Sequence, residues 1–175
     1  MTIKSLIRTI PHYPRQGVMF RDITTLLKDS VGFTLTIEAL ARQYADSKPH
    51  KVAGIESRGF IIGAALAFRL GVGFVAIRKK GKLPGETFGH DYDLEYGTDR
   101  VEMHIDAVEP GENVLVADDI LATGGTAEAA AALIEQAGGR VTECCFVVDL
   151  PDLGGKRRLQ EKGYSVFALC DFEGE

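Results

Sequence analysis

Tryptophan is absent from this sequence, cysteine is rare, and no apolar run reaches the roughly 18 residues that suggest a membrane-spanning helix. Cys144, Cys145 and Cys170 have neither the spacing of a metal site nor the pattern of a disulfide framework, so we expect small, buried, reduced thiols. The N-terminus shows no long apolar segment before a small-residue cleavage site, which argues against a secretory signal. We therefore expect a cytoplasmic protein without a membrane span.

Basic residues are also fewer than acidic residues. Lys and Arg number 20 against 25 Asp and Glu, for a formal net charge of -5. No overall positive field attracts nucleic acid or an acidic membrane, so we expect neither as a partner. Hydrophobic residues at 45% and charged residues at 26% are ordinary for a globular protein. The length predicts a single domain over residues 1–175, large enough to bury a core.

Short apolar segments alternate with helical patterns along the chain. Strands are expected at residues 51–56, 73–78, 113–118, 141–150 and 164–169. Helices are expected at residues 58–70, 126–136 and 155–162. The alternation predicts right-handed βαβ units, and therefore an α/β fold with a five-stranded parallel sheet flanked by helices.

Two segments fit this alternation less simply. Residues 33–45 show both a strand period and a helix period, and we favour a helix because Asp29 or Ser30 can cap it. Residues 81–105 are polar and contain four glycines and one proline. We expect them to form a mobile excursion that carries a short two-stranded piece.

The most informative stretch is residues 114–126, VLVADDILATGGT. Asp118 and Asp119 are expected at the carboxyl end of a buried strand, where open α/β sheets bind ligands. Glycines in the following loop let backbone amides approach an anion at a helix N-terminus. The two acids would repel a phosphate but suit the vicinal hydroxyls of a sugar. A ribose 5-phosphate satisfies both halves, with its phosphate on Ala122, Thr123, Gly124, Gly125 and Thr126.

Other interpretations of these motifs are weaker. The chain has no G-x-x-x-x-G-K-[ST] motif, which excludes a Walker nucleotide site. Residues 71–76 (GVGFVA) match a dinucleotide fingerprint but lie after a helix instead of after a strand. A plain helix cap with exposed acids would explain one threonine of DDILATGGT but not the acids, threonines and glycines together. His12, His50, His90 and His104 show no ligand spacing, and we expect surface or loop positions for them.

Residues 114–126 resemble the signature of type I phosphoribosyltransferases, in which an acidic pair follows an apolar strand and precedes TGGT. Nearly the whole chain resembles the adenine phosphoribosyltransferase family, through GVMFRD at 17–22, GIESRGF at 54–60, RKKGKLPG at 78–85, LEYG at 94–97 and DDILATGGT at 118–126. The resemblance implies transfer of ribose phosphate from 5-phosphoribosyl-1-pyrophosphate (PRPP) to adenine, giving AMP and pyrophosphate. It also implies Mg²⁺ bound through the substrate, a homodimer, and the type I fold with a small hood and a lid hairpin.

The resemblance assigns roles residue by residue. It places ribose binding on Asp118 and Asp119 and the 5-phosphate on residues 122–126. It places pyrophosphate on a loop and on lid cations, namely Glu56, Ser57, Arg58, Gly59, Arg78, Lys79 and Lys82. A non-proline cis peptide is implied near Glu56 and Ser57. A flexible lid is implied at residues 78–94, within the excursion over residues 78–105, and His90, Asp91 and Asp93 of this excursion belong to no motif.

The same resemblance places adenine in a hood that residues 1–30 help to form, against Met19, Phe20 and Arg21. Glu95 is implied as the catalytic acid, which shares a proton with the purine imidazole, and Tyr96 follows it in the lid. By pattern alone RKKGK is a solvated charge run, Glu95 an exposed loop acid and Phe20 a core residue.

Two alternative functions remain at this point. The first keeps the fold and changes the base to hypoxanthine, guanine or xanthine. The second is a non-catalytic protein that senses PRPP, which would need a DNA-binding segment that this acidic chain does not offer.

Overall fold

The computed structural model describes residues 2–94 and 96–174. Its elements in chain order are η1 Lys4–Leu6, β1 Arg8–Pro11, β2 Met19–Asp22, α1 Thr24–Leu27, α2 Ser30–Gln43, β3 Lys51–Ile55, α3 Arg58–Leu70, β4 Gly73–Lys79, β5 Thr87–Asp93, β6 Thr98–His104, β7 Asn113–Leu121, α4 Gly125–Gln136, β8 Arg140–Asp149, η2 Pro151–Leu153, α5 Gly155–Glu161 and β9 Val166–Asp171. None of the helices in these residues is long and apolar enough to cross a membrane.

The central sheet has the strand order β5-β6-β4-β3-β7-β8-β9. The five strands from β4 to β9 in this order are mutually parallel, which confirms the predicted five-stranded parallel sheet. β5 and β6 form an antiparallel hairpin whose second strand pairs with β4 through Arg78↔Glu102 and Lys79↔Val101. The predicted two-stranded piece is thus present within the excursion, with seven residues in each strand, and it extends the main sheet.

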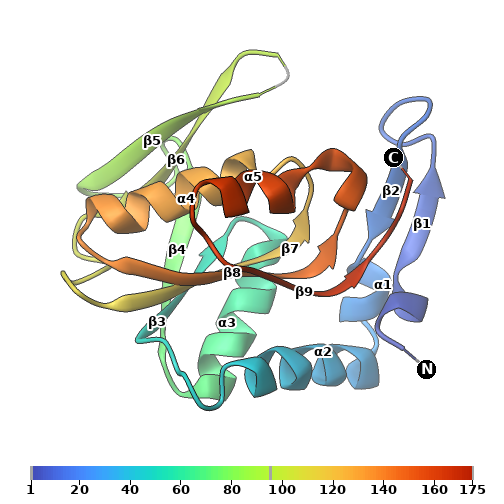
Figure 1. Ribbon diagram of the computed structural model, residues 1–175, viewed down its shortest axis with the longest axis horizontal. Helices are drawn as coiled ribbons and strands as arrows, with labels where there is room; N and C mark the ends of the chain where they lie inside the picture. Colours follow the sequence, from blue (N-terminus) through green and yellow to red (C-terminus); the bar gives the residue numbers. More distant parts are fainter. Residues whose placement is uncertain (1, 95, 175) are drawn as a thin grey trace.

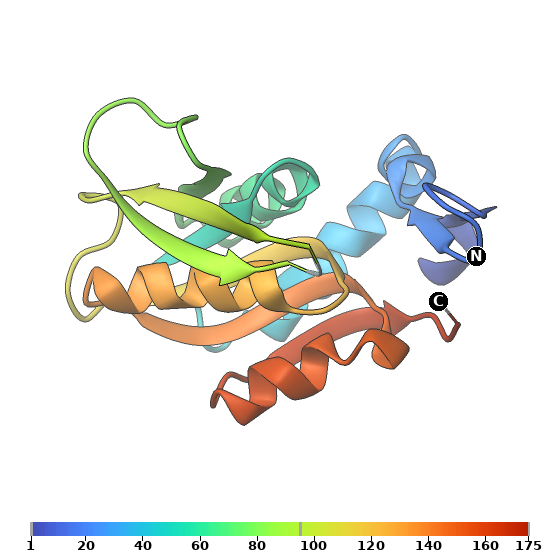
Figure 2. The same cartoon turned by 90° about the horizontal axis from the view of Figure 1, so that it is seen from above.

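Helices cover both faces of this sheet. Figures 1 and 2 show α4 and α5 on one face, with the hairpin beside α4, and α2 and α3 on the other. One core lies under α4 and includes Val116, Leu133 and Phe146. The second core lies under α2 and α3 and includes Leu40, Leu66 and Leu115. β7 contributes to both cores through alternate residues, as a central strand must.

Local signals explain most element boundaries. α3 occupies the predicted residues, and Gly71 ends it in the left-handed conformation at φ 72°. α2 is a helix, and its N-terminus is capped by Asp29, whose side chain accepts a 2.7 Å hydrogen bond from the Gly32 amide. β7 runs to Leu121, beyond the predicted end at residue 118. Its longer course reflects continued pairing with β8 up to Leu121↔Asp149.

Gly89 is one of the four glycines in the polar segment at residues 81–105. It lies inside β5, and a Cβ added there would stand 2.0 Å from an Arg100 guanidinium nitrogen. The Arg100 side chain occupies the space that a Cβ would take, and because this side chain is flexible it can move aside. Gly81 and Gly85 do have positive φ, at 78° and 81°, in the turn that precedes the hairpin.

The N-terminal residues form a small unit at one side of the sheet. β1 and β2 pair antiparallel, and both chain ends lie close to this unit in Figures 1 and 2. Arg21 joins the unit to the C-terminal segment, because its guanidinium donates to the Glu173 carbonyl and lies 4.6 Å from the Phe172 ring centroid. We call residues 1–30 the hood, as in the expectation above.

Candidate active site

Two adjoining cavities lie at the carboxyl ends of β3 and β7. The smaller, of about 100 Å³, is lined by Ala122–Ala127 together with Asp118, Ile120, Leu121 and Phe146. The larger, of about 250 Å³, is lined by Ile55, Glu56, Ser57, Arg58, Lys79, Asp118, Asp119, Ile120 and Thr126. The structure thus brings together three predicted groups: the acid pair Asp118 and Asp119, the phosphate loop at residues 122–126, and the pyrophosphate loop at residues 56–59.

The phosphate loop presents open hydrogen-bond donors. Gly124 precedes α4 with φ 84°, and no side chain caps this helix. Among the described residues, the structure gives no protein acceptor for the amides of Gly124, Gly125 and Thr126. Open amides at a helix N-terminus carry partial positive charge and suit an anion. This loop can therefore hold a phosphate group without any cationic side chain.

Two residues that support this loop were not found from the sequence. The Gly155 amide donates to the Ala122 carbonyl at 3.0 Å, and a Cβ on Gly155 would stand only 2.3 Å from that oxygen. Arg158 pairs with Glu128, and its guanidinium would lie 3.4 Å from a Cβ on Gly125. The start of α5 thus packs directly on the loop, and only the pair Gly154-Gly155 at the start of α5 indicated this close approach in the sequence.

The acid pair lies inside β7, beyond the point where its pairing with β3 ends at Ala117. Asp119 is 5% exposed and pairs with the Arg58 guanidinium. Asp118 accepts a 2.8 Å hydrogen bond from the Asp119 amide. Burial, and then the neighbouring Asp119 charge, raise the pKa of Asp118 well above its ordinary value. The two acids are therefore held in different electrostatic environments.

Gly59 allows the pyrophosphate loop to approach the acid pair. A Cβ at this position would stand 2.6 Å from the Asp118 carboxylate and 3.2 Å from the Ala117 carbonyl. The preceding peptide bond between Glu56 and Ser57 is cis, as the resemblance implied. The first turn of α3 and the end of β7 consequently meet at the cavity.

Glu56 gathers the cations that were predicted to bind pyrophosphate. Its buried carboxylate accepts hydrogen bonds from the Arg78 guanidinium at 3.1 and 3.2 Å, and Lys82 lies 3.5 Å away. Burial opposes ionisation, but the Lys79 amide and the Arg78 side chain outweigh it and lower the pKa of Glu56. A carboxylate repels pyrophosphate, so Glu56 is better suited to holding these cations than to binding the anion itself.

The hood residues lie beside the pyrophosphate loop. Met19, Phe20 and Arg21 belong to β2. The Phe20 ring packs edge-on to Tyr13, with centroids 5.2 Å apart, and lies 5.9 Å from the Arg58 guanidinium. The Arg21 side chain instead donates to Thr9 and to the Glu173 carbonyl. Phe20 thus connects the hood to Arg58 at the cavity. The Arg21 side chain is engaged within the hood and with the C-terminal segment, so this residue can contact a ligand through its backbone N–H and C=O groups.

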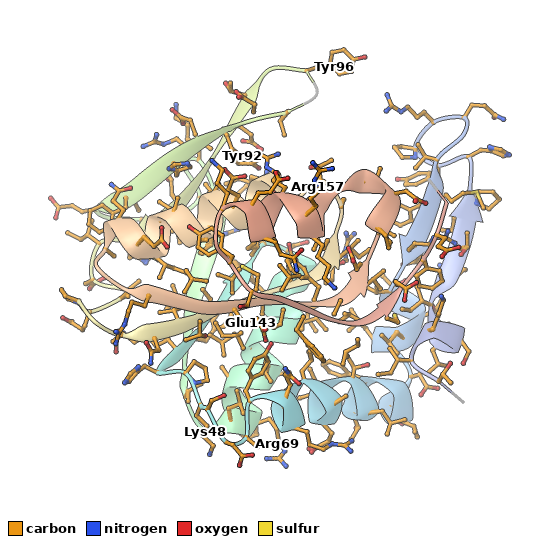
Figure 3. The ribbon with its side chains drawn as sticks, in the orientation of Figure 1. Lys48, Arg69, Tyr92, Tyr96, Glu143 and Arg157 are labelled. Carbon is orange, nitrogen blue, oxygen red and sulfur yellow. The ribbon has the colours of Figure 1, made fainter. Side chains whose placement is uncertain are left out.

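Tyr96, His90 and His104 belong to the β5–β6 hairpin and its tip. Tyr96 is 81% exposed and points away from the sheet at the tip of the hairpin in Figure 3. Glu95 lies outside the described residues. His90 and His104 lie on β5 and β6 and are partly buried, so of the expected surface or loop positions the loop alternative is wrong for these two.

Comparison with known proteins identifies the family. A family model described as phosphoribosyl transferase domain matches residues 25–170. The chain is 66% identical to the adenine phosphoribosyltransferase of Nitrosospira multiformis, over 99% of each protein. The solved enzyme of Thermoanaerobacter pseudethanolicus is 49% identical and matches with a TM-score of 0.93, over 97% of this chain and 98% of that one. The enzyme of Saccharomyces cerevisiae, solved with adenine and an imino-altritol bisphosphate, is 40% identical with a TM-score of 0.89, over 95% and 96% of the two chains. This chain belongs to the phosphoribosyltransferase family and, within it, to the adenine phosphoribosyltransferases.

Proposed function

We propose that the chain transfers the 5-phosphoribosyl group of PRPP to adenine and releases AMP and pyrophosphate, as in purine salvage. One observation carries this proposal: open amides of the phosphate loop adjoin the acid pair in a single pair of cavities. The amides suit the 5-phosphate, and the carboxylates suit the vicinal ribose hydroxyls. Both ends of a ribose 5-phosphate are thereby matched by chemically different groups.

The reaction requires the bond from ribose C1 to a pyrophosphate oxygen to break while a bond from C1 to a base nitrogen forms. The transition state is expected to resemble an oxocarbenium ion, as in glycoside chemistry. Arg58, Arg78, Lys79 and Lys82 would neutralise the departing pyrophosphate. Because Glu56 already holds Arg78 and Lys82 near the cavity, little rearrangement is needed to deliver their charge.

The outer edge of β2 would recognise the base. β2 pairs only with β1 among the described strands, so its other edge leaves main-chain donors and acceptors for a purine. Phe20 can contact the ring system, and Met19 and Arg21 flank it. Glu95 is proposed to hold the proton of the purine imidazole, with Tyr96 beside it in sequence. These roles suit adenine, which lacks the 6-oxo group of the other purines.

Mg²⁺ is proposed to enter with PRPP. Mg²⁺ usually keeps several waters and binds substrate phosphates together with one or two carboxylates, and Asp118 and Asp119 line the cavity and fit that donor set. When bound, the ion would offset negative charge on the pyrophosphate. Within residues 2–94 and 96–174, no group of three or more His, Cys, Asp and Glu side chains could hold a metal ion.

Changing Asp118 to asparagine should separate activity from stability. The pKa of Asp118 is higher in the folded protein than in the unfolded chain, where it is about 4. The free energy of unfolding therefore falls as pH rises from about 4 through the raised pKa of the folded state, because the carboxyl must ionise in an unfavourable environment. Asparagine removes this penalty and should increase the free energy of unfolding at pH 8 by on the order of 1 kcal/mol. It should also lower kcat/KM for PRPP about tenfold or more, because a charge-assisted acceptor is lost.

Urea unfolding at pH 5 and pH 8, together with steady-state kinetics, would measure both effects. The stability gain should be larger at pH 8, where the wild-type carboxylate is more fully ionised. An unchanged KM and kcat would remove Asp118 from the site. A gain that is equal at both pH values would contradict the electrostatic explanation.

We also propose that the chain forms a homodimer through α3 and β4. Ile61 and Phe68 lie seven residues apart on α3 and are 46% and 88% exposed, and Phe74 of β4 is 38% exposed. The Phe74 ring packs edge-on to Phe60 of α3, with centroids 5.8 Å apart, so the helix and the strand are in contact here. We call the exposed residues Ile61, Phe68 and Phe74 the apolar face. Large apolar side chains exposed on neighbouring elements are expected at a protein interface.

Changing Phe68 to glutamate should therefore convert a dimer to a monomer in sedimentation-velocity experiments, because a charge would be buried without a partner. Leu35 of α2 is a matched control, since it is 39% exposed outside this face. The variant Leu35→Glu should remain dimeric. A wild-type monomer at micromolar concentration, or an unaffected Phe68→Glu dimer, would refute the proposed interface.

A cytoplasmic location is proposed on the state of the cysteines. Cys144, Cys145 and Cys170 all carry free thiols. A reducing compartment keeps thiols in this form.

The choice of base is tested by comparing adenine, hypoxanthine, guanine and xanthine as acceptors under identical conditions. Adenine should give the highest kcat/KM by at least about two orders of magnitude, because unsatisfied polar groups reject a base with the wrong donors. Faster turnover of a 6-oxopurine would replace adenine in the proposal. Saturable PRPP binding without turnover of any base would instead favour a sensing protein.

A further inference from the structure

Tyr92 of β5 lies between the hairpin and the phosphate loop, although no part of the proposed reaction uses it. The side chain is 7% exposed and belongs to the core beneath α4. One ring carbon would lie 3.5 Å from a Cβ placed on Gly125, at the start of α4. Figure 3 labels Tyr92 at this junction of hairpin and helix. The ring therefore rests directly on the loop that presents open amides.

The Tyr92 hydroxyl has a full set of protein partners. It accepts hydrogen bonds from the Lys79 ammonium and, at 3.4 Å, from the Thr126 hydroxyl. It donates to the Asp99 carboxylate at 3.2 Å. A phenol has one proton and two lone pairs, so three partners use its whole capacity. Asp99 also forms an ion pair with Lys79, so Lys79, Tyr92 and Asp99 all contact one another.

Lys79 and Thr126 line the same cavity, and both contact the Tyr92 hydroxyl. Lys79 is the cation assigned to pyrophosphate, and Thr126 belongs to the loop assigned to the 5-phosphate. Resting on that proposed function, we propose that Tyr92 is a positioning residue. Its hydroxyl would hold Lys79 in place for the pyrophosphate of PRPP and Thr126 in place for the 5-phosphate. Tyr92 would act through these residues without touching the reacting atoms.

The chemistry of the partners supports this role. A lysine ammonium on its flexible four-carbon stem must be ordered before it can bind an anion, and ordering it in advance lowers that cost. The Tyr92 ring helps, because the Lys79 ammonium lies 5.1 Å from the ring centroid. The bond from Thr126 is long and therefore weak, so its proton can turn to a phosphate oxygen at little cost.

The variant Tyr92→Phe tests the proposal, because it keeps the ring and removes only the hydroxyl. KM for PRPP should rise about 5- to 20-fold, the effect of losing a hydrogen bond to a charged partner, while KM for adenine should change less than about twofold. Tyr164→Phe is the matched control, since that hydroxyl donates to Glu135 at the other end of α4. It should leave both KM values unchanged.

A double-mutant cycle separates positioning from a merely structural role. If Tyr92 acts through Lys79, then adding Tyr92→Phe to a Lys79→Met variant should raise KM for PRPP by less than about twofold. Fully multiplicative effects, or an unchanged KM for PRPP in Tyr92→Phe alone, would overturn the proposal.

Hydrogen exchange on the wild-type chain provides a test that does not depend on a folded variant. Ribose 5-phosphate should slow amide exchange in β5 and β6 as well as in residues 122–126, by at least about threefold at saturation. Protection confined to residues 122–126 would contradict the link through Tyr92. This probe needs no transfer to adenine, so protection of the hairpin in a chain that forms no AMP would refute the proposed function and leave this inference standing.

Discussion

Replacing Asp119 with alanine should lower kcat/KM for PRPP by about 100-fold or more. The Asp119 carboxylate is 5% exposed and is the partner of the Arg58 guanidinium. Its removal deletes an acceptor for the ribose hydroxyls and leaves Arg58 uncompensated beside the cavity. A 100-fold loss in kcat/KM corresponds to about 3 kcal/mol of transition-state stabilisation, which we attribute to the lost ribose contact and the displaced Arg58.

Two further variants make this result specific. Asp119→Asn keeps the shape of the side chain and removes only its charge, so we expect a loss of about tenfold to 100-fold with little change in folding. Glu38 also pairs with an arginine, Arg69, but on the α2–α3 surface. The control Glu38→Ala should retain wild-type kinetics, because exposed pairs contribute little. Wild-type kcat/KM in Asp119→Asn would show that the acid pair does not hold the ribose.

Replacing Gly155 with alanine should damage both the fold and the phosphate loop. The added Cβ would meet the Ala122 carbonyl at 2.3 Å and the Gly124 amide at 3.0 Å, and backbone atoms cannot rotate away as a flexible side chain can. We expect a loss of about 2–4 kcal/mol in the free energy of unfolding. KM for PRPP should rise at least about tenfold, because the open amides would be displaced from the positions that suit a phosphate.

Gly163 provides the control for this substitution. It follows α5 with φ 90°, and a Cβ there would meet nothing within 4 Å. Gly163→Ala should therefore cost only the backbone strain of about 1–2 kcal/mol and leave KM for PRPP unchanged. Urea unfolding and PRPP kinetics on both variants would decide the matter. Equal kinetic effects would show that α5 does not support the loop.

Features encoded by local pattern were predictable from the sequence. The alternation of apolar strands with helical segments predicted the five parallel strands, because each segment shows its own period. The acid pair and the glycine loop were found together, since they are continuous in residues 114–126. The cis peptide between Glu56 and Ser57 followed from family resemblance alone.

Features that depend on contacts distant in sequence were missed. Tyr92 lies in the polar segment at residues 81–105, and the pairing of the hairpin with β4 brings it to Thr126. Gly155 is separated from Ala122 by the whole of α4 and β8. The ion pairs of Glu56 with Arg78 and Lys82 were not apparent from the sequence, while pyrophosphate binding by its loop stays a prediction. None of these contacts leaves a periodic signal in the chain.

The central claim is that the phosphate loop and the acid pair hold a 5-phosphoribosyl group that is transferred to adenine. The most direct test incubates the purified chain with adenine, PRPP and Mg²⁺, and quantifies AMP and pyrophosphate over time. We predict that the two products appear in equal amounts and that Asp119→Ala forms them at about 1% of the wild-type rate or less when PRPP is limiting. Absence of AMP with the wild-type chain, or equal rates for wild type and Asp119→Ala, would contradict this account of the site.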